Sequence, residues 1–218
     1  MIEIVPAFLV KSQEEFEQKL RLVEDQVNLI QVDVLDGTLF PNTCWYDPKR
    51  VGSMKTSIEI ELHLMVENPI PIVEAWKNHV PTFKRAIVHA EMHRPTGTIT
   101  GFIKDELGLE VGVAINPETP LKEIEDVIHH IDVLTVMGVH PGESGRAFEG
   151  EYILEKIAHA RKHRPDLVIE IDGGVTDELI EPLVKAGVNR VCVASLIFKN
   201  DNPSDKLKEL IDRLGDTN

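Results

Sequence analysis

Two aspartates occupy equivalent places at the ends of apolar runs in this chain. Asp33 closes the run 29–33, and Asp172 closes the run 168–172. A carboxylate at the carboxyl end of a buried parallel strand lies where α/β folds place their chemistry. Two such carboxylates beside one substrate can remove a proton from one face of a carbon and return it to the other face. The pair therefore predicts acid–base chemistry that inverts a stereocentre.

A histidine is expected beside these aspartates. His63 lies near the end of a third apolar run, 58–65. Removal of a proton next to a carbonyl creates an enediolate, whose charge must be stabilised by a metal ion or by aimed donors. An imidazole beside two carboxylates suits a divalent metal ion. We therefore expect Asp33, His63 and Asp172 to form one metal site. A structural hydrogen bond for the histidine and turn capping for the aspartates are the alternatives.

These residues need a fold that brings distant strand ends together. Strand-like runs alternate with amphipathic segments along the chain, without a Ser/Gly linker, as in a parallel sheet with helices outside. We predict eight strands, at residues 4–9, 28–33, 58–65, 85–90, 110–115, 133–137, 168–172 and 190–194. We predict helices at 12–25, where Ser12 and Glu15 form a capping box, and from near residues 69, 96, 120, 149, 176 and 204.

Eight strands with helices between them in a chain of 218 residues favour a closed (β/α)8 TIM barrel that forms one domain, 1–218. An open doubly wound sheet is the alternative, but no G-x-G-x-x-G motif follows the first strand. In a barrel the strand ends gather around one mouth. The residues that become neighbours there are Asp33, His63, His89, Asn116, Met137, Asp172 and Ser195.

Composition limits the partners and the compartment. The formal net charge of −14 argues against nucleic acid and against an anionic membrane. No apolar run approaches the ~20 residues that span a bilayer, and the first residues do not resemble a signal peptide. The two cysteines, Cys44 and Cys192, share no ligand-like spacing and fit a reducing compartment. We therefore expect a cytoplasmic protein.

Small residues follow the last three predicted strands. In a barrel, the loops after the seventh and eighth strands often bind phosphate through backbone N–H groups, and glycine lets the backbone approach the anion. Tight turns alone are the alternative for each cluster. Glu143 would repel a phosphate, so we expect it to point to solvent. The three clusters are residues 138–145, 173–174 and 194–195, and together they predict a phosphate site.

Five segments in this order cover nearly the whole chain: VDVLDGTLFPN, ELHLMVENP, GVAINPETP, VMGVHPGESGRAF and IEIDGGV. Together they resemble the ribulose-phosphate 3-epimerase family of metal-dependent barrels. The resemblance implies a ribulose-phosphate-binding barrel that interconverts D-ribulose 5-phosphate and D-xylulose 5-phosphate through a cis-enediolate. It also implies one divalent metal ion, either Zn, Mn, Fe or Mg, bound by two histidines and two aspartates. A homodimer or larger ring is a further implication.

The family's roles carry over to matching positions. Asp33 and Asp172 match the acid–base pair, and with His63 they match three of the metal ligands. Gln31 replaces the other histidine, which marks a divergent member, and its neutral amide oxygen suits zinc less than imidazole does. We expect lower metal affinity or a preference for manganese or magnesium. The matches to phosphate-binding and substrate-binding positions are Ala7, Met65, Met137, Gly142, Gly145, Gly173, Gly174, Ala194 and Ser195.

Departures from the family pattern leave three hypotheses for function. Ala7 stands where the family has a serine, and Leu35 stands where it has a methionine. The first hypothesis is an epimerase of D-ribulose 5-phosphate. The second is an epimerase of another phosphorylated ketose, such as a ketohexose 6-phosphate, because Ala7 and Leu35 alter the wall beside the sugar chain. The third is a metal-free, inactive barrel that binds phosphate, which Gln31 and Ala7 favour.

Overall fold

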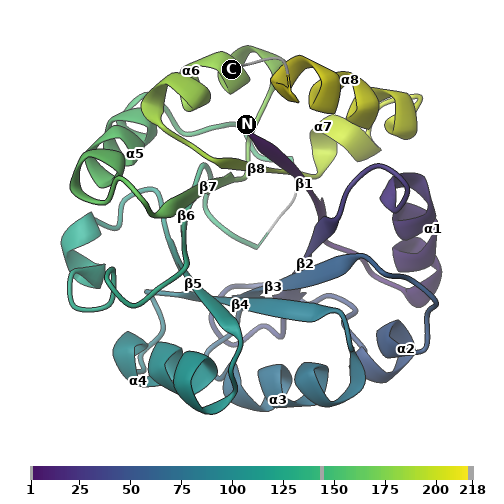
Figure 1. Ribbon diagram of the computed structural model, residues 1–218, viewed down its shortest axis with the longest axis horizontal. Coiled ribbons are helices and arrows are strands. Elements are labelled where there is room, and N and C mark those ends of the chain that lie inside the picture. The colour runs from purple at the N-terminus through teal and green to yellow at the C-terminus, as the bar shows by residue number, and fades with distance from the viewer. Residues whose placement is uncertain (1, 143–144, 216–218) are drawn as a thin grey trace.

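The computed structural model describes residues 2–142 and 145–215, and its strands form one closed barrel (Figure 1). All eight strands pair in parallel in chain order, and the last pairs with the first. They are β1 Glu3–Phe8, β2 Leu29–Leu35, β3 Glu59–Met65, β4 Phe83–His89, β5 Glu110–Ile115, β6 Val133–Met137, β7 Val168–Asp172 and β8 Arg190–Val193. The predicted (β/α)8 barrel is confirmed. The expectation for Glu143 lies outside the described residues.

Helices form an outer ring around these strands (Figure 1). They are α1 Gln13–Val23, α2 Pro48–Gly52, α3 Ile70–His79, α4 Thr96–Gly101, α5 Tyr152–His163, α6 Asp177–Ala186, α7 Ser195–Phe198 and α8 Pro203–Gly215. α4 continues as a π-helical turn, Phe102–Glu106, and the helix predicted from residue 120 is a single 3-10 turn, Leu121–Ile124. Within the described ranges, no helix is long and apolar enough to cross a membrane.

α1 begins where the sequence predicts. The hydroxyl of Ser12 accepts a hydrogen bond from the backbone N–H of Glu15 at 3.2 Å, which satisfies one free donor of the first turn. The Glu15 carboxylate accepts from the backbone N–H of Lys11 at 2.8 Å. The return bond of the predicted capping box therefore goes to the residue before Ser12. It still fixes the path of the chain between β1 and α1.

Most of the apolar core lies between the strands and the helices. Phe8 of β1, for example, packs edge-to-face against Phe16 of α1, and both side chains are fully buried. Trp76 of α3 is also fully buried and packs against Phe83 at the start of β4. Because alternate strand residues face opposite sides, the other half of each strand points into the barrel. The inward residues are the ones that build the site.

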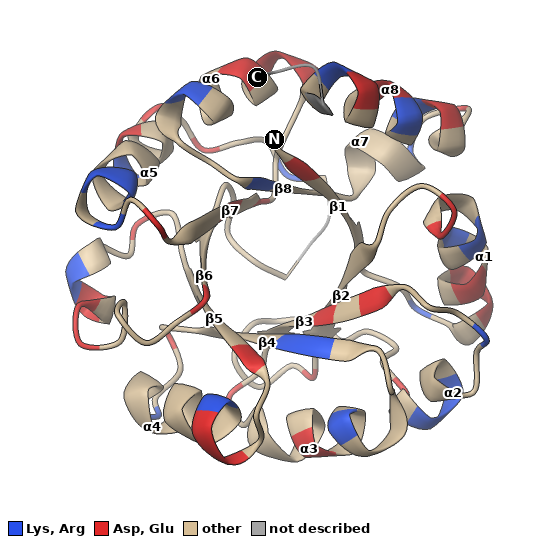
Figure 2. Ribbon diagram, in the orientation of Figure 1, with Lys and Arg blue, Asp and Glu red and all other residues tan. Residues whose placement is uncertain are grey.

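Charged side chains occupy the inside of the barrel at the amino-terminal ends of the strands. Glu61 is fully buried and forms ion pairs with Arg85 and, at 3.0 Å, with Arg190. Arg190 also pairs with the buried Glu170 at 2.9 Å, and Thr135 donates to Glu170 at 2.8 Å. Figure 2 shows the corresponding positive segments on β4 and β8 and the negative one on β3. This network lies two residues before the site along β3 and β7.

Candidate active site

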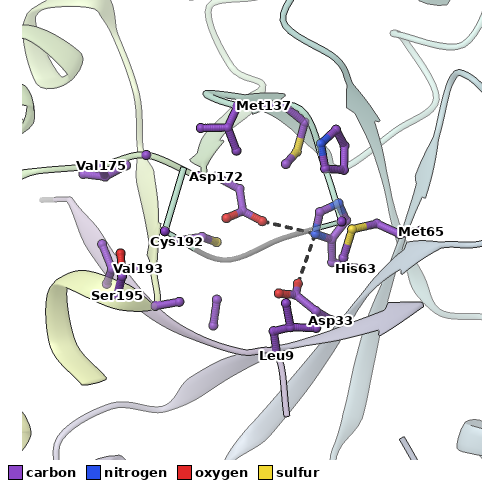
Figure 3. Close-up of a pocket in the computed structure, with 18 residues that line it drawn as sticks. Leu9, Asp33, His63, Met65, Met137, Asp172, Val175, Cys192, Val193 and Ser195 are labelled. Carbon is purple, nitrogen blue, oxygen red and sulfur yellow. Dashed lines mark hydrogen bonds and ion pairs between the residues drawn. The ribbon is translucent and has the colours of Figure 1, made fainter. Parts of the chain in front are cut away.

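The loops and strand ends at the carboxyl side of the barrel surround one pocket (Figure 3). All of the predicted catalytic, metal-binding and phosphate-binding residues line it except Gln31, which is fully buried, and the predicted mouth residues His89 and Asn116 are buried and do not line it. The pocket therefore brings together residues from six of the eight predicted strand ends and their loops, those of β1, β2, β3, β6, β7 and β8. Its lining residues are Ala7, Leu9, Asp33, His63, Met65, Met137, Val139, Pro141, Gly142, Gly145, Asp172, Gly173, Gly174, Val175, Cys192, Val193, Ala194 and Ser195.

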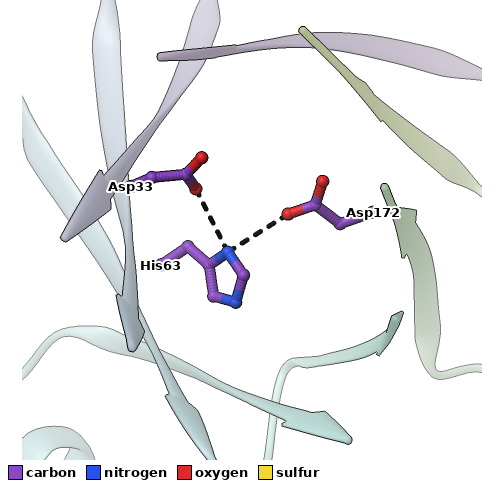
Figure 4. Close-up of side chains that lie close together, drawn as sticks. All are labelled: Asp33, His63 and Asp172. Atoms are coloured by element: carbon purple, nitrogen blue, oxygen red, sulfur yellow. Dashed lines mark hydrogen bonds and ion pairs between the residues drawn. The ribbon is translucent and has the colours of Figure 1, made fainter. Parts of the chain in front are cut away.

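At the base of the pocket, one imidazole lies between two carboxylates (Figure 4). Nδ1 of His63 is 3.1 Å from Oδ1 of Asp33 and 3.1 Å from Oδ2 of Asp172. Asp33 and His63 are register partners on neighbouring strands, and Asp172 comes from the end of β7. Asp33 lies two residues before the end of β2, which runs further than predicted. The barrel thus unites the three residues as the sequence predicts.

The charge of His63 follows from these neighbours. The imidazole is fully buried, which disfavours its charged form, but its hydrogen bonds to Asp172 and Asp33 outweigh the burial. They raise the pKa of His63 to about 10. In the absence of a metal ion, the imidazolium therefore supplies positive charge between the two carboxylates at neutral pH.

The Gln31 amide is the second group that joins the two aspartates. Its nitrogen donates to Oδ1 of Asp33 at 2.9 Å and to Oδ2 of Asp172 at 2.8 Å. Its oxygen accepts from the thiol of Cys192, with 3.2 Å between Sγ and Oε1. The amide nitrogen, rather than the oxygen, faces the carboxylates. Coordination of a metal ion by the Gln31 oxygen requires the amide to turn over and to lose these bonds.

The donor set fits a divalent metal ion at three positions. The ligand atoms of Asp33, His63 and Asp172 all lie within 4.8 Å of one another, and two carboxylates with one imidazole suit Zn, Mn or Fe. A second close group in the described part of the chain, Glu61, Glu170 and Cys192, has its carboxylates paired with arginines. The first group is therefore the candidate metal centre, and Gln31 is its fourth ligand only in the turned orientation.

Behind His63 lie two residues that the sequence-based predictions do not assign to the site. Nε2 of His63 is 2.8 Å from Nε2 of His89, and Nδ1 of His89 is 2.9 Å from Oε2 of Glu91. The sequence predicts His89 at the mouth without a role and predicts no role for Glu91. A carboxylate two residues after a strand-end histidine is the signal that could have found this pair.

Burial and hydrogen bonding set the charges of this second pair. Burial lowers the pKa of His89 in spite of its bond to Glu91. Burial opposes ionisation of Glu91, but its carboxylate accepts from His89, from the backbone N–H of Asn116 and from the Thr119 hydroxyl. These bonds lower the pKa of Glu91 to about 2. The pair is therefore a neutral imidazole beside an ionised carboxylate.

The small residues gather on the side of the pocket formed by the loops after β6, β7 and β8. Gly173 and Gly174 have φ values of +93° and +70°, which residues with a Cβ rarely adopt. A Cβ on Gly174 would also lie 2.7 Å from the backbone nitrogen of Phe148. Asn42 donates to the carbonyl of Gly142 at 3.0 Å and so ties the loop after β2 to the loop after β6. This arrangement is compatible with the predicted phosphate site.

Comparison with known proteins points to the same family. The profile described as "Ribulose-phosphate 3 epimerase family" matches residues 3–198. Ribulose-phosphate 3-epimerase from Bacillus subtilis (strain 168) is 29% identical over 96% of this chain and 98% of its own length. The enzyme of that name from Aquifex aeolicus (strain VF5) is 35% identical over 84% of this chain and 82% of its own length.

A solved structure supports the fold separately. 3-Hexulose-6-phosphate synthase from Salmonella typhimurium superposes with a TM-score of 0.74 at 15% identity and covers 100% of both chains. At this identity the similarity concerns the barrel alone. The profile match spans most of the chain, and it includes Asp33, His63 and Asp172. The chain belongs to the ribulose-phosphate 3-epimerase family.

Proposed function

We propose that the protein is a ketose-phosphate 3-epimerase that interconverts D-ribulose 5-phosphate and D-xylulose 5-phosphate. Family membership confirms the expected enzyme class, an isomerase acting on carbohydrate phosphates. The observation that carries the proposal is the placement of Asp33 and Asp172, from two strands, around one imidazole at the base of the pocket. This is the arrangement that a two-carboxylate proton transfer needs.

In the proposed reaction, one aspartate removes the C3 proton and the other delivers a proton to the opposite face. Gln31 donates to Oδ1 of Asp33 and to Oδ2 of Asp172, so each carboxylate uses its other oxygen for the substrate. These bonds fix the directions in which the two carboxylates point. Stereochemical inversion depends on that fixed geometry, because each carboxylate must stay on its own side of C3.

Positive charge is needed where the enediolate forms. Asp33, His63 and Asp172 would hold a divalent metal ion, which would supply that charge as a Lewis acid. Met65 and Met137 line the pocket and provide an apolar surface that excludes water from the sugar. We propose that backbone groups of the small residues after β6, β7 and β8 hold the phosphate.

We propose the pentulose phosphate rather than the hexulose phosphate as the substrate, because only one of the two altered wall positions touches the pocket. Ala7 lines it, whereas Leu35 is fully buried and is not among the lining residues. Leu35 therefore changes the packing beneath the loop after β6 rather than the surface that meets the sugar. We propose a small phosphorylated sugar as partner, a cytoplasmic location and self-association into a homo-oligomer, in line with the net charge and the family.

Exchange of the substrate C3 proton tests the proposal. The protein is incubated in D2O with D-ribulose 5-phosphate or with a ketohexose 6-phosphate, and NMR follows deuterium at C3 and the epimer formed. Elemental analysis of the same sample gives the metal content. We expect exchange and epimerisation with the pentulose phosphate, faster than with the hexulose phosphate. No exchange with either sugar, together with no bound metal, would favour the inactive phosphate-binding barrel.

A further inference from the structure

A row of three side chains leads away from the base of the pocket. The rings of His63 and His89 are stacked, with centroids 5.0 Å apart and an interplanar angle of 22°, and their Nε2 atoms are 2.8 Å apart. Both rings are fully buried. At this distance one nitrogen must carry a proton and the other must present a lone pair. The hydrogen bond between the two rings therefore has a direction, given by the ring that carries the proton. A group beyond His89 has to fix that direction.

Glu91 sets that direction. An ionised carboxylate only accepts hydrogen bonds, so the 2.9 Å contact with Oε2 places a proton on Nδ1 of His89. A neutral His89 with its proton on Nδ1 presents a lone pair at Nε2. The shared proton of the histidine pair then belongs to Nε2 of His63, and His63 is the donor.

The far end of the row is fixed to the loop after β5. Oε1 of Glu91 accepts from the backbone N–H of Asn116 at 2.8 Å and from the Thr119 hydroxyl at 2.6 Å. On the other side, the ring of Phe40 packs against His89 at a centroid distance of 4.9 Å. Glu91 is therefore held in one orientation, and its second oxygen is left for His89.

We propose that Glu91 and His89 are positioning residues that set the tautomer of His63. With its proton held at Nε2, His63 turns the lone pair of Nδ1 toward Asp33 and Asp172, where a metal ion or a second proton binds. This inference deepens the proposed function and rests on it for the role of His63. It applies the general rule that the outer nitrogen of a ligating histidine is oriented by a further partner, here reached through a second ring.

Replacing one carboxylate oxygen of Glu91 by an amide nitrogen reverses the direction of both hydrogen bonds in the row. In Glu91→Gln, the amide oxygen keeps the bonds from Asn116 and Thr119, so the amide nitrogen faces Nδ1 of His89 and donates to it. His89 must then carry its proton on Nε2 and donate to His63. His63 accepts at Nε2 and holds its own proton on Nδ1, which blocks the lone pair that faces the aspartates.

Nitrogen NMR of protein labelled with ¹⁵N-histidine reads these tautomers directly, without an activity assay. For metal-free wild-type protein we expect His89 to be protonated on Nδ1; in Glu91→Gln we expect it to be protonated on Nε2. Glu67→Gln is the matched control, because Glu67 accepts from His93 at 3.2 Å on the surface, away from the pocket. In that variant the tautomer of His89 should not change.

Calorimetric titration with Mn²⁺ provides a second readout. We expect Glu91→Gln to raise the dissociation constant for Mn²⁺ by about 10-fold to 100-fold, and Glu67→Gln to leave it unchanged. An unchanged tautomer in Glu91→Gln would overturn the proposal, as would an unchanged Mn²⁺ affinity. If that variant does not fold, an Nε2 proton on His89 in the wild-type spectrum would overturn it alone. A wild-type protein with the expected tautomer but no epimerase activity would refute the proposed function and leave this inference standing.

Discussion

Gln31 gives the site a hydrogen-bond donor at the place where two carboxylates meet. Its amide nitrogen contacts both Asp33 and Asp172, and the thiol of Cys192 holds the amide oxygen on the other side. The lone pairs that accept these bonds are among those that a metal ion would use. Gln31 therefore competes with metal binding while it holds the carboxylates in place.

Restoring an imidazole at this position is expected to strengthen metal binding. Gln31→His removes the competing donor and adds a ligand that zinc prefers, so we expect Zn²⁺ affinity to rise roughly tenfold or more. Competition with a chelator measures it. Ala7→Ser is the control, because Ala7 is the register neighbour of Gln31 on β1 and lines the pocket. Equal zinc affinity in Gln31→His and wild type would contradict the expected competition.

The two thiols are expected to react slowly. Burial raises the pKa of Cys44 to about 11 and raises that of Cys192 well above its usual value. Because the thiolate is the reactive form, little of either cysteine is available at pH 8. Mass spectrometry after timed treatment with iodoacetamide should show much slower labelling in the native protein than after unfolding in urea. Equal rates before and after unfolding would refute this.

The positions of the site residues were predictable, but their contacts were not. A place at the carboxyl end of a barrel strand was enough to bring Asp33, His63 and Asp172 together. The orientation of the Gln31 amide and the stacking of His63 on His89 depend on side-chain rotation and on neighbours from other strands. Such features carry no period in the sequence.

Among the elements, the strands followed the sequence pattern closely and the short helices did not. β5, β6 and β7 have the predicted bounds, because continuous apolar runs with turn residues at both ends define buried parallel strands. The helices α2 and α7 span 5 and 4 residues, too few for an amphipathic period to show. The loops that follow the strands depend more strongly on single glycines.

Gly138 shows how tightly these loops pack. A Cβ at this position would lie 2.2 Å from the carbonyl oxygen of Gly173, so the loops after β6 and β7 would have to separate. We expect Gly138→Ala to lower the free energy of unfolding by about 1–3 kcal/mol, as measured by urea titration. It should also weaken substrate binding, because both loops line the pocket.

Gly97→Ala is the matched control for this substitution. Gly97 lies in α4, and a Cβ there would lie 3.4 Å from Cγ1 of Val127, the nearest atom. Because alanine favours the helix, we expect a gain of about 0.5–1 kcal/mol in the free energy of unfolding. Equal losses of stability in the two variants would show that the close approach to Gly173 is not the cause.

Across the whole molecule, the ion network inside the barrel links stability to pH. Burial, helped by the nearby Glu170, raises the pKa of Glu61 from 4.5 to about 7, against the opposing effect of Arg190 and Arg85. The folded protein therefore keeps a proton that the unfolded chain releases. This contribution stabilises the fold below about pH 4.5 and is lost as the pH rises through 7.

Glu61→Gln is expected to flatten this dependence. The wild-type free energy of unfolding should fall between pH 5 and pH 8 by up to about 3 kcal/mol more than that of the variant. Urea titrations at several pH values measure the two slopes. Glu59→Gln is the control, because Glu59 is on the same strand but pairs with Lys84 at the surface. Equal slopes in wild type and Glu61→Gln would refute the role of Glu61.

The epimerisation rate of the Asp172→Asn variant is the most direct test of the two-aspartate mechanism. The substitution keeps the shape of the side chain but removes the proton acceptor, and a positioned acid or base contributes about 10²-fold to 10⁴-fold. We expect the rate of D-xylulose 5-phosphate formation to fall by at least about 10²-fold while the circular dichroism spectrum is unchanged. Asp166→Asn, an exposed position before β7, should keep the full rate. An undiminished rate in Asp172→Asn would contradict the mechanism.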